Sequence, residues 1–450
     1  MPARRDRAGS GTVRLAVAVL RSPNPNKAPD PVVYLEGGPG GSALSAVETW
    51  LTPSSPLLAD RDVILVDQRG TGWSEPRLSC DKESRRHPEA STDDEVAALF
   101  AACRRRLTSE GVDLAAFSTE ESAADVADLR TALGLGSVDL FGVSYGTRLA
   151  LRVLADHPEG VRAAVLDSVY PVGVHGYEAE AAVLWDAISR LFAGCHADPA
   201  CDAAFPDLER RVSEAIGRLQ DQPVTASITD PETGEAYDAD IAGADVVDAL
   251  GSALYLSAAI PDLPRALDLI ARGRVGEGYD LLQSAGATEP TDPSTAAEPP
   301  DAGRRPDDSD GLFYAVECAE EAPDNRRAGI DDRSAGVPEP WRSILVDSAA
   351  ASLADCAAWD LPARPAPATR SSVPTLLLAG TYDPVTPPSW AEQAAGGLSS
   401  SRTVVVDGAG HAVIDAGTCP QQLVVSFLRD PGAVLAGTPT CTATPAFRTR

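Results

Sequence analysis

The chain has 450 residues, which is long enough for one large domain with an insertion or for two or three smaller domains. Its net charge of −28 repels phosphate backbones and anionic lipid surfaces, so nucleic acid is excluded as an expected partner. Hydrophobic residues make up 44% of the sequence, but no apolar run approaches the roughly 18 residues that a membrane span needs. We therefore expect a soluble globular protein with no membrane span and with neutral or cationic partners. The sequence leaves its oligomeric state open.

Strand-like apolar runs with turn residues behind them recur along the chain. They are LAVAVL (15–20), VVYL (32–35), DVILVD (62–67), VDLFG (138–142), AAVLD (163–167), TLLLAG (375–380) and TVVVDG (403–408). Helical patterns separate them, and residues 117–136 form one, with Ser118 and Glu121 at capping-box spacing. Continuous apolar strands that alternate with helices predict an α/β fold with a mostly parallel central sheet and helices on both faces.

The pattern becomes helical between residues 173 and 345, without a comparable series of strands. We therefore expect three parts: a first part of the α/β core (1–172), an inserted helical lid (173–345) and a second part of the core (346–450). Within the lid, residues 284–311 are rich in Pro, Asp and Ala and poor in large apolar residues. Such a segment cannot bury enough surface to order itself, so a mobile acidic loop is expected there.

Eight cysteines, at positions 80, 103, 195, 201, 318, 356, 419 and 441, fall into four sequence-local couples. An even number in couples is typical of a disulfide framework in an exported protein. Eight cysteines allow 105 connectivities, and we expect the pairing of neighbours: 80–103, 195–201, 318–356 and 419–441. None of the couples forms a CxxC metal motif, and we expect neither a metal nor an organic cofactor.

The first residues do not read as a signal peptide, because their only apolar run, 15–20, is short and flanked by Arg14 and Arg21. Two interpretations remain. Either the protein stays in the cytoplasm with free thiols, or a leader precedes the start of this chain. The cysteine couples favour the second interpretation, a secreted or cell-envelope protein.

Ser144 lies in the sequence Gly142-Val143-Ser144-Tyr145-Gly146, which matches G-x-S-x-G at the point where a strand pattern turns into a helix pattern. A turn of this kind strains the serine and leaves room only for glycine two positions away on either side. It also directs the backbone N–H of Tyr145 toward the place where an oxyanion would form. The motif predicts Ser144 as a nucleophile.

A serine nucleophile needs a base, and on this type of sheet the partners follow in the order Ser, Asp, His at later strand ends. Asp383 comes just after the run 375–380, and His411 comes just after the run 403–408. The other histidines, at positions 87, 157, 175 and 196, lack such a setting. We predict Ser144, Asp383 and His411 as the catalytic triad.

The oxyanion hole needs a second donor, which the glycine-rich segment GGPGGS (37–42) behind the run 32–35 is placed to give. Pro39 has no N–H, and we assign the donor to Gly38 just before it. A phosphate-binding loop is excluded, because no Lys-Ser or Lys-Thr pair follows.

The segments GGPGGS, DQRGTGWSEP (67–76), GVSYG, GTYDPVTPP (380–388) and GAGH (408–411) together resemble the prolyl iminopeptidase and tripeptidyl aminopeptidase family of α/β-hydrolase serine peptidases. The resemblance implies the α/β-hydrolase fold and structural roles for Asp67 and Arg69. Glu36 departs from it, because the family commonly has His or Asn before GGPG.

The resembled family anchors the substrate's amino terminus with acids of the lid, for which Glu317, Glu320 and Glu321 are candidates here. A solvated acidic face is the plain alternative. The leading functional hypothesis is a serine aminopeptidase acting through an acyl-enzyme on a peptide substrate. The alternatives are an esterase or small-amide hydrolase, because the triad does not encode the leaving group, and a catalytically inactive peptide-binding protein.

Overall fold

The computed structural model describes residues 1–47, 55–86, 93–230, 233–285, 308–443 and 446–449. The expected mobile loop, 284–311, lies largely outside these residues. Within them, the main sheet has seven strands in the order β1-β3-β2-β4-β5-β8-β9, and all neighbours are parallel except β1 and β3. The strands are β1 (Val17–Leu20), β2 (Val32–Leu35), β3 (Val63–Val66), β4 (Val138–Val143), β5 (Val161–Asp167), β8 (Thr375–Gly380) and β9 (Ser401–Val406).

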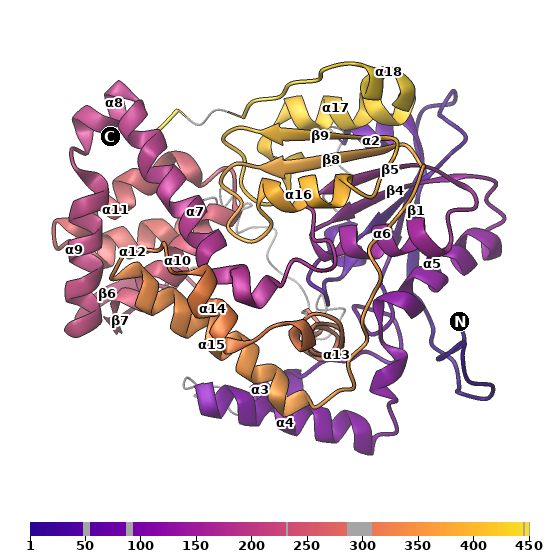
Figure 1. The fold of residues 1–450 in the computed structure, drawn as a ribbon, viewed down its shortest axis with the longest axis horizontal. Helices are drawn as coiled ribbons and strands as arrows, with labels where there is room; N and C mark the ends of the chain where they lie inside the picture. The colour runs from indigo at the N-terminus through magenta and orange to yellow at the C-terminus, as the bar shows by residue number, and fades with distance from the viewer. Residues whose placement is uncertain (48–54, 87–92, 231–232, 286–307, 444–445, 450) are drawn as a thin grey trace.

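Helices cover both faces of this sheet (Figure 1), because its central strands are apolar on both sides. One face packs against α2 (Pro56–Asp60), α17 (Thr418–Arg429) and α18 (Pro431–Ala436). The other packs against α5 (Thr119–Ala132), α6 (Tyr145–Asp156) and α16 (Pro388–Ala395). Ser118 caps α5 as predicted, since its side chain accepts from the backbone N–H of Glu121. The α/β fold class predicted from the sequence is confirmed.

Strands β5 and β8 are neighbours in the sheet, yet residues 168–374, almost half of the chain, separate them in sequence. This stretch contains α7 (Gly176–Ala197), α8 (Pro199–Ala204), α9 (Leu208–Asp221), α10 (Gly243–Tyr255), α11 (Leu263–Ala271), α12 (Val275–Ser284), α13 (Asp310–Glu320), α14 (Arg327–Arg333) and α15 (Trp341–Trp359). It also contains a hairpin of β6 (Val224–Thr229) and β7 (Ala236–Ile241), although the sequence pattern gave no strands there.

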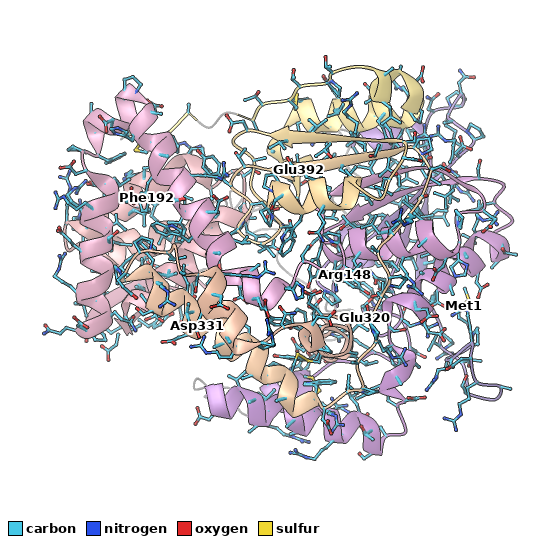
Figure 2. The ribbon with its side chains drawn as sticks, viewed as in Figure 1. Met1, Arg148, Phe192, Glu320, Asp331 and Glu392 are labelled. Atoms are coloured by element: carbon cyan, nitrogen blue, oxygen red, sulfur yellow. A yellow bond between two sulfur atoms is a disulfide. The ribbon has the colours of Figure 1, made fainter. Side chains whose placement is uncertain are left out.

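The insertion has an apolar core of its own, separate from the cores on the two faces of the sheet. Trp341 is fully buried in it, with its ring against Trp185 and Phe192 and its indole N–H donating to Ser213 Oγ at 2.9 Å. Figure 2 places Phe192 within this body and Arg148 beside the sheet. Helix α15 runs across residues 345 and 346, where we expected the lid to end and the second part of the core to begin, and β8 starts only at Thr375.

Helix α4 (Asp93–Ser109) lies beside α13 and α15 at the edge of the insertion, and the short helix α3 (Asp81–Ser84) packs against α4 (Figure 1). Short 3₁₀ turns complete the described elements: η1 (Ala43–Ala46), η2 (Leu114–Ala116), η3 (Ile260–Asp262), η5 (Ala322–Asp324) and η6 (Val413–Ala416). None of the described helices has the length and apolar character that a membrane crossing requires.

The eight cysteines form four disulfides with the pairing of neighbours predicted from the sequence. They are Cys80–Cys103, Cys195–Cys201, Cys318–Cys356 and Cys419–Cys441. Cys80–Cys103 joins the start of α3 to α4, and Cys318–Cys356 joins α13 to α15. Four disulfides are typical of a protein from an oxidising compartment.

Candidate active site

The predicted site residues follow the carboxyl ends of four parallel strands. Gly38 follows β2, Ser144 follows β4, Asp383 follows β8 and His411 follows β9. Because these strands are parallel, their carboxyl ends lie at one edge of the sheet, where ligand sites of open α/β sheets form. The same edge faces the helical insertion, whose residue Tyr255 contacts His411.

Ser144 occupies a sharp turn between β4 and α6. Its φ of 56° and ψ of −126° are strained for a residue with a side chain. A Cβ on Gly142 would lie 2.3 Å from the Gly146 carbonyl oxygen, and one on Gly146 would lie 2.0 Å from the Leu35 carbonyl oxygen. Both glycines of the motif are therefore required by the close approach of neighbouring backbone.

Asp383 and His411 form a buried pair. His411 Nδ1 lies 2.9 Å from Asp383 Oδ2, and both residues are at most 5% exposed. Thr386, which the sequence analysis did not single out, supports the carboxylate: its hydroxyl donates to Asp383 Oδ2 at 2.6 Å and its backbone N–H to Oδ1 at 2.8 Å. The carboxylate is thus fixed on the Nδ1 side of the imidazole, which leaves Nε2 for a reacting group.

The charges of this pair stabilise each other. Burial lowers the pKa of His411, but the Asp383 carboxylate outweighs burial, and the pKa lies above its ordinary value. Burial raises the pKa of Asp383, but the imidazolium charge and the Thr386 hydrogen bonds outweigh it, and the pKa falls below its ordinary value. This arrangement favours an imidazole that accepts a proton while the carboxylate stays ionised.

His411 Nε2 is buried and makes no hydrogen bond to any described residue. Beside it lies Tyr255, at the end of α10, whose ring centroid is 4.2 Å from that of His411. Burial raises the pKa of the Tyr255 phenol, Asp383 adds to the rise, and an interaction with the Ser144 hydroxyl opposes it. Tyr255 therefore meets both the serine and the histidine, a contact that the sequence did not indicate.

Hydrogen bonds from two sides hold the loop that carries His411. On the core side, the Asp167 carboxylate accepts the backbone N–H groups of Val413 and Ile414, each at 2.8 Å. On the insertion side, the His411 backbone N–H donates to the Tyr255 carbonyl at 3.0 Å, and the Ser257 hydroxyl accepts from Gly410 at 2.9 Å. The position of the imidazole thus depends on the core and on the insertion together.

The glycine-rich loop behind β2 lies directly beside Ser144. A Cβ on Gly37 would lie 3.0 Å from Ser144 Cβ, and Gly38 borders the same cavities as Ser144. Glu36 holds this loop, because its Oε1 accepts from the Gly37 N–H at 2.8 Å and its Oε2 from the Tyr34 hydroxyl at 3.2 Å. Burial raises the pKa of Glu36.

Asp67 and Arg69 lie away from the reacting groups. The Asp67 carboxylate accepts from Ser42 Oγ at 2.9 Å and from the backbone of Leu44 and Trp73 at 3.0 and 2.9 Å. Arg69 is fully buried and donates to both oxygens of Asp125, at 2.8 and 2.7 Å. Both residues thus tie loops together.

Two cavities meet at Ser144. The first, of about 630 Å³, is bordered by the insertion and has Tyr170, Glu180, Asp248, Phe313, Glu317 and Trp390 among its lining residues. The second, of about 590 Å³, lies toward the core and has His411 in its lining. Gly38, Ser144 and Tyr255 border both cavities. A substrate bound across Ser144 therefore has room on either side of the scissile bond.

The three candidate carboxylates of the insertion have different surroundings. Glu317 lines the first cavity, and it is 4% exposed. Its Oε2 accepts from the Tyr170 hydroxyl at 3.0 Å, whereas Oε1 has no hydrogen-bond partner among the described residues. Burial raises the pKa of Glu317 to about 7. An acceptor buried without a partner is costly, so this oxygen is available for a ligand.

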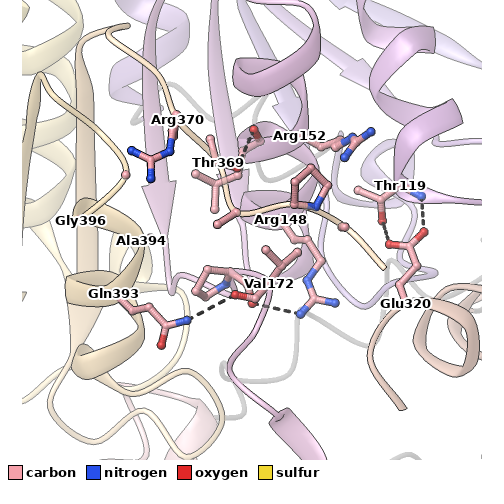
Figure 3. A pocket seen from close by; sticks show the side chains of 16 residues that line it. Thr119, Arg148, Arg152, Val172, Glu320, Thr369, Arg370, Gln393, Ala394 and Gly396 are labelled. Atoms are coloured by element: carbon pink, nitrogen blue, oxygen red, sulfur yellow. Dashed lines mark hydrogen bonds between the residues drawn. The ribbon is translucent and has the colours of Figure 1, made fainter. Parts of the chain in front are cut away.

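Glu320 and Glu321 do not line that cavity. Glu320 accepts from the Thr119 backbone N–H at 2.8 Å and from its hydroxyl at 2.5 Å, in a separate pocket of about 220 Å³ (Figure 3). Glu321 pairs with buried Arg148 at 2.6 Å and accepts from the Gly176 N–H at 2.6 Å. Arg148 in turn lies over the Tyr170 ring, 3.8 Å from its centroid, and Tyr170 is the residue that donates to Glu317. Glu321 therefore supports Tyr170 through Arg148.

No group of three or more His, Cys, Asp or Glu side chains is arranged to hold a metal ion in the part of the chain that the structure describes. At the strand ends lie a strained serine, a histidine whose Nε2 makes no hydrogen bond to a described residue, and a carboxylate on its other nitrogen, which are the groups that nucleophilic catalysis requires.

Comparison with known proteins agrees with this chemistry. Residues 30–218 match the family described as alpha/beta hydrolase fold, and residues 343–438 match the family described as TAP-like protein. Serine protease Hip1 of Mycobacterium tuberculosis (strain ATCC 25618 / H37Rv) is 26% identical over 438 residues, which cover 92% of this chain and 81% of that protein.

Two other relatives match over different shares of the chain. Putative hydrolase YuaR of Escherichia coli (strain K12) is 23% identical over 93% of this chain and 81% of its own length. Probable proline iminopeptidase of Streptomyces coelicolor (strain ATCC BAA-471 / A3(2) / M145) is 28% identical over 43% of this chain and 48% of its own. The resemblance read from the motifs is confirmed: the chain is a serine hydrolase of the α/β-hydrolase fold, and the names of its relatives support a peptidase family.

Proposed function

We propose that this serine hydrolase is an aminopeptidase that releases a short N-terminal fragment from peptides through an acyl-enzyme on Ser144. The observation that carries the proposal is the free carboxylate oxygen of Glu317, buried in the cavity that Ser144 borders. A substrate ammonium group supplies the donor that Oε1 lacks, and an ammonium–carboxylate hydrogen bond is of the strong, charge-assisted kind. The names of the relatives, a serine protease and a proline iminopeptidase, support peptide substrates.

In the proposed reaction, Ser144 Oγ attacks the scissile carbonyl while His411 Nε2 takes its proton. Asp383 keeps the imidazole oriented and stabilises its positive charge. The backbone N–H groups of Tyr145 and Gly38 donate to the oxyanion. His411 then gives the proton to the leaving amine, and a water molecule, deprotonated by the same histidine, hydrolyses the ester to free Ser144 and the released fragment.

The first cavity contains further acidic residues near the proposed position of the substrate's amino terminus. Glu180 and Asp248 also line it, and burial raises the pKa of Glu180 to about 7. These acids add negative potential around the amino terminus without an arginine or lysine among the described lining residues. We propose that Glu320 and Glu321 support the anchor indirectly, by fixing Thr119 and Arg148.

The proposed organisation is a core interrupted by a helical lid that carries Glu317 and Tyr255. Because α15 packs along α7 and α4, we place the end of the lid after Trp359 and not at residue 345. The four disulfides favour a protein that works outside the cytoplasm, in the cell envelope or the medium.

The test compares peptide amides that differ only by acetylation of the amino terminus, beside a small neutral ester such as 4-nitrophenyl acetate. The wild-type enzyme is expected to cleave the free peptide at least tenfold faster in kcat/KM, because a blocked terminus leaves Glu317 unpaired. Glu317→Gln should lower kcat/KM about tenfold for the free peptide, because one charged hydrogen bond is lost. It should change kcat/KM for the ester little.

Glu209→Gln is the matched control, since Glu209 is an exposed acid of the insertion on α9. It removes the same charge and should leave kcat/KM unchanged for both substrates. Equal cleavage of free and acetylated peptides would contradict the aminopeptidase, and efficient turnover of the ester alone would make the protein an esterase.

A further inference from the structure

The second cavity at Ser144 has a composition of its own. Apolar walls come from Tyr34, Leu57, Phe141 and Ile414, and two carboxylates, Glu36 and Asp415, stand among them. None of the described residues that line it is a lysine or an arginine. The cavity therefore combines apolar surface with two carboxyl groups that no lysine or arginine of the described lining accompanies.

The position of His411 decides which half of a substrate this cavity receives. His411 lines the second cavity and not the first, and its unpartnered Nε2 is the atom that returns the proton to the leaving group. Proton transfer requires hydrogen-bond distance to that group. The chain that leaves must therefore lie on the His411 side of the scissile bond, while the acylating fragment lies on the side of Glu317.

The two carboxylates flank the path that the leaving chain would take. Glu36 directly precedes Gly37, which touches Ser144, so it lies at the inner end. Asp415 lies four residues beyond His411 and is exposed at the outer end. Its side chain has no hydrogen bond or ion pair to a described residue, whereas Glu36 is held by Gly37 and Tyr34.

The electrostatic environment of both groups is unfavourable for anions. Burial raises the pKa of Glu36, and the charges of Asp308 and Asp415 add to the rise. Although the Asp415 side chain is open to solvent, the protein around it partly desolvates the carboxylate and raises its pKa. A cation placed between them would replace the solvation that they have lost and relieve their mutual repulsion.

We propose that this cavity is the binding site for the leaving chain, and that Glu36 and Asp415 select substrates with lysine or arginine directly after the scissile bond. The apolar walls suit the methylene stem of such a side chain, and the carboxylates suit its charged end. This inference rests on the proposed function only in taking the leaving group to be a peptide chain.

Interception of the acyl-enzyme by added amines tests the site without requiring any peptide to be cleaved. The acetyl-enzyme forms from 4-nitrophenyl acetate, and an amino-acid amide then competes with water for its carbonyl. The amine nitrogen attacks, its proton passes to His411 and on to Ser144 Oγ, and an N-acetyl amino-acid amide leaves. By microscopic reversibility the amine must occupy the site of the leaving chain.

The experiment uses lysine amide, norleucine amide and glutamate amide at equal concentrations of free amine, and measures N-acetyl product against acetate. Lysine amide should exceed norleucine amide about three- to tenfold, as expected for a partly solvated charge pair, and glutamate amide should fall below both. Asp415→Asn and Glu36→Gln should each lower the ratio of N-acetyl product to acetate for lysine amide until it is close to the ratio for norleucine amide. The product ratio is independent of how fast the variant acylates.

Glu392→Gln serves as the matched control, because Glu392 is exposed on α16 and lines neither cavity. It should keep the lysine preference of the wild type. Equal trapping of lysine and norleucine, a preference that survives Asp415→Asn and Glu36→Gln together, or no aminolysis by any amide would each overturn the proposal. A lysine preference in an enzyme that cleaves acetylated and free peptides equally would uphold this site and refute the aminopeptidase.

Discussion

The rings of Tyr255 and His411 lie 4.2 Å apart between centroids, one on the helical insertion and the other on the core. The Tyr255 carbonyl also accepts the backbone N–H of His411 at 3.0 Å. A residue of the insertion therefore positions the imidazole, and the reaction centre is completed only when the insertion packs against the strand ends.

Two substitutions separate the roles of the Tyr255 ring and hydroxyl. Tyr255→Phe keeps the ring contact and loses the interaction with Ser144, so kcat/KM should fall about three- to tenfold for ester and peptide alike. Tyr255→Ala also removes the ring on which His411 packs and should lower kcat/KM roughly tenfold further. Steady-state kinetics with an unfolding curve for each variant measure this, and an alanine variant as active as the wild type would contradict it.

The predicted pH dependence follows from the pair of His411 and Asp383. The base must be neutral, and its pKa is raised above about 6.5 because Asp383 outweighs burial. The ester kcat/KM should therefore rise with pH through an inflection above about 6.5. Asp383→Asn removes the charge but keeps the burial, so the inflection should move to lower pH while the maximal rate falls. An inflection that stays in place would contradict the account.

The protonation of His411 also affects the free energy of unfolding. The folded-state pKa of His411 is raised above the unfolded value, so the pair stabilises the fold fully below about 6.5. That contribution is lost as the pH rises through the folded-state pKa. The unfolding free energy of the wild type relative to His411→Gln should thus shrink toward alkaline pH, as denaturant titrations at several pH values would reveal.

Patterns local in sequence predicted much of the fold and of the candidate site. Apolar runs followed by turn residues marked the strand ends, and the positions of Ser144, Asp383 and His411 after those runs placed them at one edge of the sheet. The disulfide pairing was predictable because each pair closes a short loop, with separations of 23, 6, 38 and 22 residues.

What the sequence did not reveal depends on packing between distant elements. The contact of Tyr255 with His411 spans two parts of the fold, and Glu321 differs from Glu317 because Arg148 reaches it from α6. Two features had a local signal that was available. Thr386 follows Asp383 at the spacing of a side-chain-to-backbone turn, and residues 341–359 lack the Gly or Pro that would end a helix at 345.

Removal of single disulfides should have unequal effects. Cys318–Cys356 closes 38 residues and Cys195–Cys201 closes 6, so loop entropy assigns about 4 and about 2 kcal/mol of unfolding free energy to them. The first also ties α13, which carries Glu317, to α15. Cys318→Ser with Cys356→Ser should therefore lower stability more than the other pair and lower peptide cleavage more than ester cleavage. Equal losses of stability for the two cysteine pairs, with equal losses of peptide and ester cleavage, would contradict this prediction.

Ser144→Ala and His411→Ala should each lower kcat by roughly 10⁴- to 10⁶-fold while the protein stays folded, because triad residues act as a unit. The double variant should be scarcely worse than either single one. Circular dichroism checks the fold, and labelling by a fluorophosphonate should disappear in Ser144→Ala. Near-normal turnover by that variant would place the nucleophile elsewhere.

The central claim is that Ser144 becomes esterified by the N-terminal fragment of a peptide, and intact-mass spectrometry after rapid acid quench measures this directly. A free-amine peptide amide mixed with enzyme for milliseconds should add the mass of its N-terminal fragment less water. Digestion should then place the adduct on Ser144, and the adduct's mass gives the number of residues released. An adduct on another residue, an adduct of the C-terminal fragment, or cleavage without any covalent adduct under conditions where the ester gives one would contradict the account.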